Sequence, residues 1–468
     1  MTTTSDKPAR RIASAPSLNQ AILADATADL RDANLEFARR HPGDPAGRQP
    51  VHTVYGGAQL FGADAAAKIG GVAQRAMEEY APTPAILGAA LGIQEHPSLD
   101  TVHARVREKL GREAVEDFRI DFEDGYGNRT DEEEDHHAVV VGEELARGMK
   151  ERSLPPFIGI RVKTLTEELR GRSMRTLDIV LTTVVAKAGA LPDNFVVTIP
   201  KITIAEQVSY TVAVLRQLER TLGLPKESLR FEVMVETPQI VLSHDGSSLL
   251  PRLVELSEGR LSAAHFGTYD YTASLNITAA HQRMGHPAND FAKQFMQVAL
   301  AGTGVWLSDG STAVLPVPVH RAAAGATLSN AQIAENRAAM HDAWQLHFDD
   351  VRHSLVGGFY QGWDLHPAQL VTRYAALYAF FLEGIEAAGA RLRNFVDKAA
   401  QATLVGNVFD DAATGQGLLN FFLRGINSGA VTETEALRMT GLTEEDFRGR
   451  SFSRIMGSRT AATASADR

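Results

Sequence analysis

The amino-acid sequence predicts a (β/α)8 barrel. Eight short apolar runs rich in β-prone residues alternate with longer stretches of helix-forming composition, which is the pattern of parallel strands joined by helices. With 468 residues, 44% of them hydrophobic, the chain has room for such a barrel and for helical additions, because these barrels commonly exceed ~250 residues. The eight runs, in chain order, are VHTVYGG, FRIDFED, FIGIRVKT, FVVTIPK, RFEVMVETP, SAAHFGTYD, GVWLSDG and LVGGFYQGWDLHP.

Helical stretches lie before, between and after these runs. The segments SYTVAVLRQLERTLG and NDFAKQFMQVALAGTG have helix-forming composition and end at glycine, as helices commonly do. A leading helix is predicted over residues 18–40, and from about Arg373 onward the pattern becomes purely helical. We therefore expect an N-terminal tail and helix over 1–45, the barrel over 46–372, and a helical C-terminal extension with a mobile tail over 373–468.

The overall composition favours small-molecule chemistry. A net charge of −10 argues against nucleic acid or an anionic membrane surface as a partner, because both would repel an acidic protein. The absence of cysteine excludes thiol catalysis, cysteine-bound zinc and disulfides. We expect a cytoplasmic protein, since the first residues, MTTTSDKPARRIASAPS, lack the apolar core of a signal peptide and no stretch is apolar enough to span a bilayer.

Two of the runs are closed by acids, Glu236 in FEVMVETP and Asp270 in HFGTYDYT. Ends of parallel strands meet at one face of a barrel, where these enzymes keep their active sites. Two carboxylates there could share a hard cation, because Mg²⁺ typically takes only one or two protein carboxylates and keeps water and substrate oxygens. We predict Mg²⁺, with Mn²⁺ as a possible substitute. The structural alternative is that both acids stabilise the first turns of the helices that follow.

A second group of acids follows the run FRID. Strand alternation would point Asp121 and Glu123 to the same side, with Asp124 at the lip of the barrel. The group could orient water on the cation or position a basic side chain, or it could be an ordinary solvated loop. The next acidic segment, TDEEEDHHAV, is typical of a solvated helix start, and we do not expect its two histidines to bind metal.

Two basic residues also end apolar runs. Arg161 closes FIGIR, and its guanidinium could bind an acidic substrate through two hydrogen bonds or could pair with Asp121 or Glu123 as structure. Lys201 closes FVVTIPK and could form a Schiff base with a carbonyl substrate. A metal mechanism is preferred, because a covalent lysine would not explain why two later strands each end in an acid.

Taken in order, these motifs resemble a known superfamily. DFEDGYG, IRVK, IPKI, VMVETPQ, HFGTYDYTASLN, HPANDF with GVWLSDG, and GFYQGWDLHPAQL are similar to motifs of the citrate lyase beta-subunit and HpcH/HpaI aldolase superfamily, over about 121–370. The resemblance implies a (β/α)8 barrel acting on pyruvate-like or acyl-CoA substrates. It also implies that Glu236 and Asp270 bind Mg²⁺, that Arg161 binds the substrate carboxylate, and that the acids near Asp121 support the site. It further implies that Gly267 and Thr268, beside the metal aspartate, and His366 bind the substrate. His366 and Gln369 match the motif that follows the last strand of the superfamily barrel.

The chain also departs from that pattern. The first strand lacks the arginine of the RSxLFVP segment that meets coenzyme A in citrate lyase-like members, so the use of coenzyme A is left open. A tyrosine, Tyr269, stands where the usual glutamate precedes the metal aspartate, and a glycine, Gly362, stands where a lysine is common. These departures suggest a different reaction partner, and the first-strand residues His52, Tyr55 and Gln59 are candidates for binding it.

The reaction we predict is a carbon-carbon lyase or aldolase reaction through a metal-stabilised enolate of pyruvate or a related 2-oxo acid. Three alternatives stay open: an acyl-CoA lyase or thioesterase, a phosphotransferase that uses phosphoenolpyruvate, and a non-catalytic regulatory barrel. No general acid or base is assigned, and His265, His281 and His286 are expected to pack or to form hydrogen bonds rather than to catalyse. We expect a homo-oligomer, in which a C-terminal helical segment of another subunit could supply the missing group.

Overall fold

The computed structural model describes residues 20–45, 47–323, 325–397, 403–405, 408–410, 412–452 and 454–456. The chain forms two compact units, one of Met1–Pro45 with Ala301–Gly304 and one of Ala46–Leu300 with Val305–Arg468. The first unit contains helix α1, Gln20–Arg40, which agrees with the predicted leading helix. The predicted mobile tails at the two chain ends lie outside the described residues. None of the described helices is long and apolar enough to cross a membrane.

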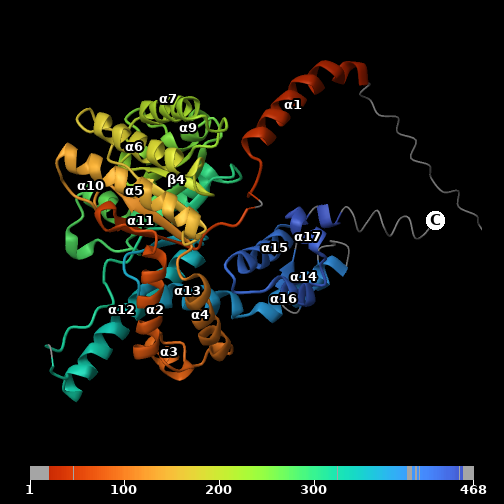
Figure 1. Cartoon of the computed structure of the whole chain (residues 1–468). Coiled ribbons are helices and arrows are strands. Elements are labelled where there is room, and N and C mark those ends of the chain that lie inside the picture. Colours follow the sequence, from red (N-terminus) through yellow and green to blue (C-terminus); the bar gives the residue numbers. More distant parts are fainter. Residues whose placement is uncertain are drawn as a thin grey trace, which may run out of the picture. The chain divides into compact units, whose positions relative to one another are not determined.

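Eight parallel strands build the second unit and confirm the predicted (β/α)8 barrel (Figure 1). They are hydrogen-bonded in the order β7-β6-β5-β4-β3-β2-β1-β8. A bridge between Ser311 and Trp363 brings the segment after β7 against β8, so the barrel is nearly closed. Each of the eight apolar runs of the sequence supplies one strand. The strands are β1 His52–Gly57, β2 Asp117–Asp121, β3 Phe157–Arg161, β4 Phe195–Ile199, β5 Arg230–Val235, β6 Leu261–Phe266, β7 Trp306–Ser308 and β8 Gly362–Asp364.

Helices follow the strands and cover the barrel, as the alternation in the sequence predicts. The start of α5 shows how local sequence sets a boundary: the Thr130 side chain accepts a hydrogen bond from the Glu133 backbone, and four acids occupy the positive first turn. Figure 1 shows α5 and α6 side by side, and α4 beside α13 from the far end of the chain. The covering helices are α2 Ala65–Tyr80, α3 Pro84–Ala90, α4 Leu99–Glu113, α5 Asp131–Glu151, α6 Arg170–Ala188, α7 Ala205–Leu222, α8 Pro238–Val241, α9 Leu249–Leu256, α10 Thr268–Ser274, α11 Pro287–Leu300 and α12 Asn330–Val356, with short 3-10 turns η1 Ala58–Leu60 and η2 Ala279–His281.

The C-terminal part begins with α13, Gln369–Leu382, which is buried on nearly every side. Its sequence, QLVTRYAALYAFFL, is apolar all round rather than on one stripe, which is typical of a helix enclosed by other elements. The helix crosses the predicted domain boundary at residue 373. The expectation of a purely helical extension is wrong, because a short antiparallel pair, β9 and β10, lies between the helices. The remaining elements are α14 Ile385–Asp397, β9 Thr403–Val405, β10 Val408–Asp410, α15 Ala412–Asn427, α16 Glu433–Thr440 and α17 Glu444–Gly449.

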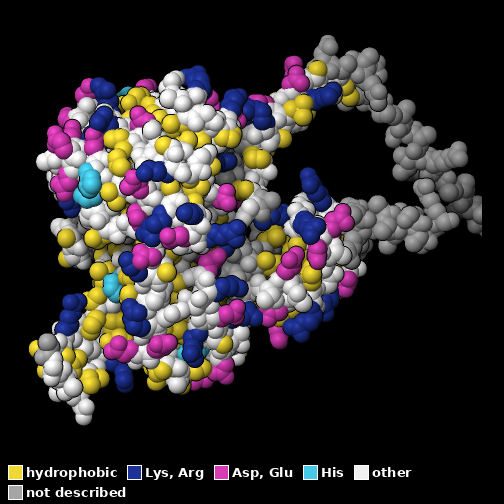
Figure 2. All heavy atoms as spheres, viewed as in Figure 1, with side chains coloured by type: hydrophobic (Ala, Val, Ile, Leu, Met, Phe, Trp, Pro, Cys, Tyr) yellow, Lys and Arg dark blue, Asp and Glu magenta, His cyan; other side chains and the backbone are white. Residues whose placement is uncertain are grey.

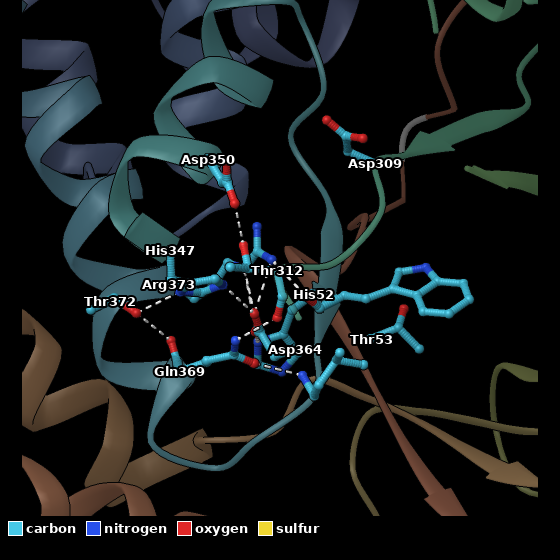
Figure 3. A network of polar contacts seen from close by, with 12 residues as sticks. His52, Thr53, Asp309, Thr312, His347, Asp350, Asp364, Gln369, Thr372 and Arg373 are labelled. Carbon is cyan, nitrogen blue, oxygen red and sulfur yellow. Dashed lines mark hydrogen bonds and ion pairs between the residues drawn. The ribbon is translucent and has the colours of Figure 1, made fainter. Parts of the chain in front are cut away.

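A buried polar cluster joins β8 to β1 and to the helices α12 and α13 (Figure 3). Asp364 accepts hydrogen bonds from Arg373 Nε at 3.1 Å and Nη2 at 2.9 Å. His347 Nε2 lies 3.1 Å and His52 Nδ1 3.3 Å from the same carboxylate. Burial alone would raise the pKa of Asp364, but Arg373 and the two histidines hold it well below its usual range. We call these four residues the Asp364 cluster. It is a buried network of charged and polar side chains that connects the sheet to the helix layer.

The outer surface mixes charges of both signs. On the face seen in Figure 2, Lys and Arg side chains alternate with Asp and Glu side chains over the helices of the barrel. Many of these charges form pairs one helical turn apart, such as Arg147 with Glu151 and Arg170 with Glu167. Acidic side chains outnumber basic ones instead at the carboxyl ends of the barrel strands.

Candidate active site

The predicted site residues meet at the carboxyl ends of the barrel strands. Asp121 and Arg161 are the last residues of β2 and β3 and are register partners in the sheet. Glu236 directly follows β5, and Asp270 lies in the first turn of α10, four residues beyond the end of β6. A cavity of about 380 Å³ opens there. Its lining consists of Tyr55, Gly57, Asp121, Asp124, Gly125, Arg161, Glu236, Phe266, Gly267, Thr268, Tyr269, Asp270, Ser311, Trp363 and Leu365.

Arg161 is held by carboxylates of the β2 end. Its Nε and Nη2 donate to the two oxygens of Asp121 at 2.8 and 2.5 Å, which is the two-pronged geometry that fixes a guanidinium. Its Nη1 lies 3.1 Å from Glu123 and 3.6 Å from Asp124. We call these four residues the Arg161 cluster. Asp121 therefore sets the orientation of the guanidinium, and Nη1 is the corner with the looser contacts.

The turn after β2 depends on two close backbone approaches. Asp121 also accepts hydrogen bonds from the backbone nitrogens of Glu123 at 2.9 Å and Gly125 at 2.7 Å. A Cβ at Gly125 would come within 2.6 Å of Asp121 Oδ2, so only glycine allows this contact. The sequence DFEDG thereby folds into a turn that presents both Glu123 and Asp124 to Arg161.

An aromatic pair forms the floor beneath Arg161. The guanidinium carbon lies 4.9 Å from the centre of the Tyr55 ring and 5.9 Å from that of Trp363. The two rings stack on each other at 4.3 Å with an interplanar angle of 25°. The Trp363 indole donates to His265 Nδ1 at 3.3 Å, which ties the floor to the interior of the barrel. Cation-π contact of this kind adds to the fixation of a guanidinium by hydrogen bonds.

Lys201 links the two groups of acids. Its Nζ contacts Glu123 and lies 3.3 Å from Asp124 and 3.7 Å from Asp270. Its backbone nitrogen donates to Glu236 at 2.8 Å, and its φ of 51° places it in the left-handed region. Burial alone would lower the pKa of Lys201, but the surrounding carboxylates raise it above its usual value. The amine is therefore held as an ammonium ion, which disfavours the Schiff-base alternative.

Glu236 is a buried acid that forms no salt bridge with a basic side chain of the described residues. Burial and the charge of Asp270 raise the pKa of Glu236 to about 8. Burial likewise raises the pKa of Glu123 to about 7, and one of its oxygens has no hydrogen-bond partner among the described residues. A Cβ at Gly267 would come within 2.5 Å of Glu236, so this glycine leaves the space that the carboxylate occupies. Asp270 is 43% exposed and faces the opening.

The charges of the site do not balance. Five carboxylates (Asp121, Glu123, Asp124, Glu236 and Asp270) share two cations, Arg161 and Lys201. In the part of the chain that the structure describes, no three acidic or histidine side chains are already gathered around one point as metal ligands. Two carboxylates beside a cavity nevertheless fit a cation that completes its shell with water and substrate oxygens, and such an ion would relieve the charge that raises the pKa of Glu236.

Comparison with known proteins defines the family. A family model described as a domain of unknown function, DUF6986, matches residues 30–455. The chain belongs to the DUF6986 family. Solved structures of similar fold include a citrate lyase from Burkholderia xenovorans LB400, with 18% identity and a TM-score of 0.53 over 85% of this chain and 97% of that chain. A magnesium/glyoxylate complex of Haloferax volcanii malate synthase is also similar, with 13% identity and a TM-score of 0.46 over 86% of this chain and 99% of that chain. At these identities the likeness concerns the fold. A search of curated protein sequences found no match.

Some residues predicted for the site of this DUF6986 member lie elsewhere. Gln369 is the first residue of α13, and His366 lies in the turn before it. Gln369 accepts hydrogen bonds from the backbone of Leu365 and His366 at 2.7 and 3.0 Å, and His366 lies outside the cavity lining. His52, a candidate for binding the reaction partner, is fully buried in the Asp364 cluster, so that expectation is wrong. Gln59 lies at the edge, where its amide donates to the Gly125 carbonyl at 3.3 Å.

Two of the three departures from the superfamily pattern have structural explanations. The Tyr269 hydroxyl donates to the Ser311 carbonyl at 2.9 Å and accepts from the Ala313 backbone at 2.8 Å, so it ties α10 to the segment after β7. A Cβ at Gly362 would meet the guanidinium of Arg373 at 2.9 Å, so a longer side chain would displace the Asp364 cluster. Tyr269 thus lines the cavity and also fixes its wall, whereas Gly362 serves the packing of the Asp364 cluster.

The sequence interpretation missed the apolar side of the cavity. Trp363 and Leu365 lie on either side of Asp364, and both line the cavity while Asp364 points to the helix layer. The alternation of side chains along a strand, applied to the run GWDL, could have indicated this.

Proposed function

We propose that this protein is an enzyme that forms or breaks a carbon-carbon bond beside a 2-oxo acid, through the enolate of pyruvate or a related acid. The observation that carries the proposal is the excess of carboxylates over cations around a small cavity at the catalytic end of a barrel. Such an arrangement suits a divalent cation and an anionic substrate together, whereas a purely structural barrel has no use for unbalanced buried acids.

Glu236 and Asp270 are the residues that would hold the cation, with Mg²⁺ preferred because all the available donors are oxygens. When bound, the cation would supply Lewis-acid polarisation of the substrate oxygens. The Lys201 backbone fixes Glu236 on one side and Gly267 leaves room for it on the other, so the carboxylate is already oriented.

Arg161 would bind the substrate carboxylate. Asp121 occupies Nε and Nη2, so the carboxylate approaches Nη1, which lies 3.1 Å from the buried Glu123 and 3.6 Å from Asp124, which is 59% exposed. Asp124 can turn outward into solvent as the substrate enters. The aromatic floor of Tyr55 and Trp363 keeps the guanidinium from moving down into the barrel.

In the direction of bond formation, a base takes a proton from C3 of the 2-oxo acid, and the electron pair of the broken C–H bond forms the enolate. The enolate carbon then attacks the carbonyl carbon of the partner, and the partner oxygen takes up a proton. In the direction of cleavage, the electrons of the carbon-carbon bond return to the enolate, which is protonated at C3. Neither direction requires an oxidant or a reductant.

Exchange of the methyl protons of pyruvate in D2O tests the proposal, because exchange needs the enolate and no second substrate. We expect the protein with Mg²⁺ to accelerate the loss of the methyl proton signal above the rate with Mg²⁺ alone. Removing the metal with chelator should abolish the acceleration, and Glu236→Gln should do the same. The matched control Glu258→Gln, at an exposed glutamate paired with Arg216, should exchange like the wild type. An exchange rate that is unchanged by chelator and by Glu236→Gln would contradict the proposal.

A further inference from the structure

The residues around the cavity are of two chemical kinds. The acids, Arg161 and Lys201 form the charged part. The apolar part of the lining consists of Tyr55 and Trp363, which also form the floor beneath Arg161, and Leu365, which directly follows β8. A small 2-oxo acid held at Arg161 leaves this apolar part for the second reactant.

Exposed aliphatic side chains also lie on the segments that carry the cavity-lining residues Leu365 and Ser311. Leu365 is 39% exposed at the cavity, and Val314 and Leu315 on the segment after β7 are 51% and 39% exposed. These residues lie close together because the Gln369 amide accepts from the Leu365 backbone at 2.7 Å and donates to the Thr312 carbonyl at 3.0 Å. We call Val314, Leu315 and Leu365 the apolar rim.

The segment that carries the rim is fixed in place. Tyr269 holds both Ser311 and Ala313, and the Thr312 hydroxyl donates to Asp350 of α12 at 2.6 Å. The exposed valine and leucine side chains therefore start from an anchored backbone at the mouth. Exposed apolar surface that is contiguous with a cavity is typical of a binding site rather than of an ordinary loop.

The opposite part of the mouth would repel an anion. Asp124 and Asp270 are 59% and 43% exposed there. Arg161 is the one cation among the described residues that line the cavity, and three carboxylates already contact it. Lys201, behind the lining, also contacts three acids. With Asp270 on the cation and Arg161 on the carboxylate of the 2-oxo acid, a phosphate or carboxylate on the second reactant would meet the exposed Asp124 without a spare cation in the lining.

We propose that the second reactant is an uncharged carbonyl compound with an apolar chain, which packs on Trp363 and Leu365 and leaves the cavity across the apolar rim. The inference rests on the proposed enolate chemistry and specifies its partner. An aldehyde of this class accepts the enolate carbon at its carbonyl carbon, and its oxygen becomes the hydroxyl of the aldol product. Phosphorylated aldehydes, semialdehydes that carry a carboxylate, and coenzyme A thioesters are poor partners.

The test is a panel of aldol reactions with pyruvate and Mg²⁺, run beside the deuterium exchange of pyruvate alone. The probes are hexanal, acetaldehyde, succinic semialdehyde, glyceraldehyde 3-phosphate and, for coenzyme A chemistry, acetyl-CoA with glyoxylate. We expect kcat/KM for hexanal to exceed that for succinic semialdehyde by at least ~10-fold, since a few buried methylenes are worth that much discrimination.

Paired variants locate the effect. Leu365→Ser should lower the ratio of kcat/KM for hexanal over acetaldehyde about 10-fold. Val298→Ser, at an 84% exposed valine on α11, should leave this ratio unchanged. Deuterium exchange of pyruvate together with a preference for a charged partner or for acetyl-CoA would overturn the inference and leave the enolate chemistry intact. The same conclusion would follow if Leu365→Ser did not change the ratio of kcat/KM for hexanal over acetaldehyde. Absence of exchange would overturn both.

Discussion

Two buried aspartate-arginine pairs in this barrel have opposite surroundings. In the Asp364 cluster, one carboxylate is surrounded by Arg373 and two histidines and is sealed between the sheet and the helices (Figure 3). In the Arg161 cluster, one guanidinium is surrounded by three carboxylates, and the group opens to a cavity. The pKa values differ accordingly, since the pKa of Asp364 is held low while that of Glu123 is raised to about 7. An aspartate-arginine pair thus stabilises the fold in the Asp364 cluster, whereas in the Arg161 cluster it lies among an excess of acidic side chains beside the cavity.

The largest effect on stability is expected at the balanced cluster. Arg373→Leu leaves Asp364 buried without its main counter-charge, which should lower the free energy of unfolding by about 3–5 kcal/mol. Arg352→Leu, which breaks an exposed pair with Glu383, should cost less than about 1 kcal/mol. Urea unfolding measures both. A loss at Arg373 no larger than that at Arg352 would contradict the structural role of the Asp364 cluster.

At the candidate active site, removing the charge of an acid should raise the free energy of unfolding rather than lower it. The pKa of Glu236 is raised from 4.5 to about 8, so ionisation of this acid destabilises the metal-free folded protein as the pH rises through that window. At pH 9 in the presence of chelator, Glu236→Gln should therefore increase the free energy of unfolding by on the order of 2 kcal/mol. Glu219→Gln, at a buried glutamate paired with Arg260, should decrease it. Destabilisation by both variants would remove the distinction between the two kinds of acid.

The Asp364 cluster should lose its stabilising effect at low pH. Because the pKa of Asp364 is depressed in the folded protein, its contribution is present at neutral pH and is lost as the pH falls below about 4, with a slope of up to ~1.4 kcal/mol per pH unit. The difference in the free energy of unfolding between wild type and Asp364→Asn should thus shrink as the pH falls from 6 to 2. A difference that stays constant over this range would show that the charge of Asp364 is not what stabilises the cluster.

The smallest effects are expected from one added methyl group beside the Asp364 cluster or beside Glu236. Gly362→Ala would press on Arg373 at 2.9 Å and should cost about 1–2 kcal/mol of stability with little effect on metal binding. Gly267→Ala would press on the Cβ and a carboxylate oxygen of Glu236 at 2.5 Å, so it should weaken Mg²⁺ binding, measured by calorimetry, in addition to lowering stability. Weaker Mg²⁺ binding in Gly362→Ala, or unchanged Mg²⁺ binding in Gly267→Ala, would contradict these expectations.

The fold was predictable because eight apolar runs interrupted by helix-forming segments leave few other architectures. The positions of Arg161, Glu236 and Asp270 were predictable for a related reason, since residues that end parallel strands must meet at one face. The contacts of Lys201 with three acids were not predictable, because they depend on how the turn after β2, the end of β4 and α10 come together in space. The exclusion of His52 from the site likewise depends on the direction in which β1 faces α13, which local sequence does not encode.

The central claim is that Glu236 and Asp270 form one pocket for a cation and an enolate. Thermal unfolding with Mg²⁺ and with oxalate, a mimic of the pyruvate enolate, alone and together, tests it most directly in wild type and in Glu236→Gln. Ligand at about 100 times its dissociation constant should add ~2.7 kcal/mol to the wild type only when both components are present, and the gain should vanish in Glu236→Gln. Absence of any shift in the wild type, or an equal shift in both proteins, would contradict the account.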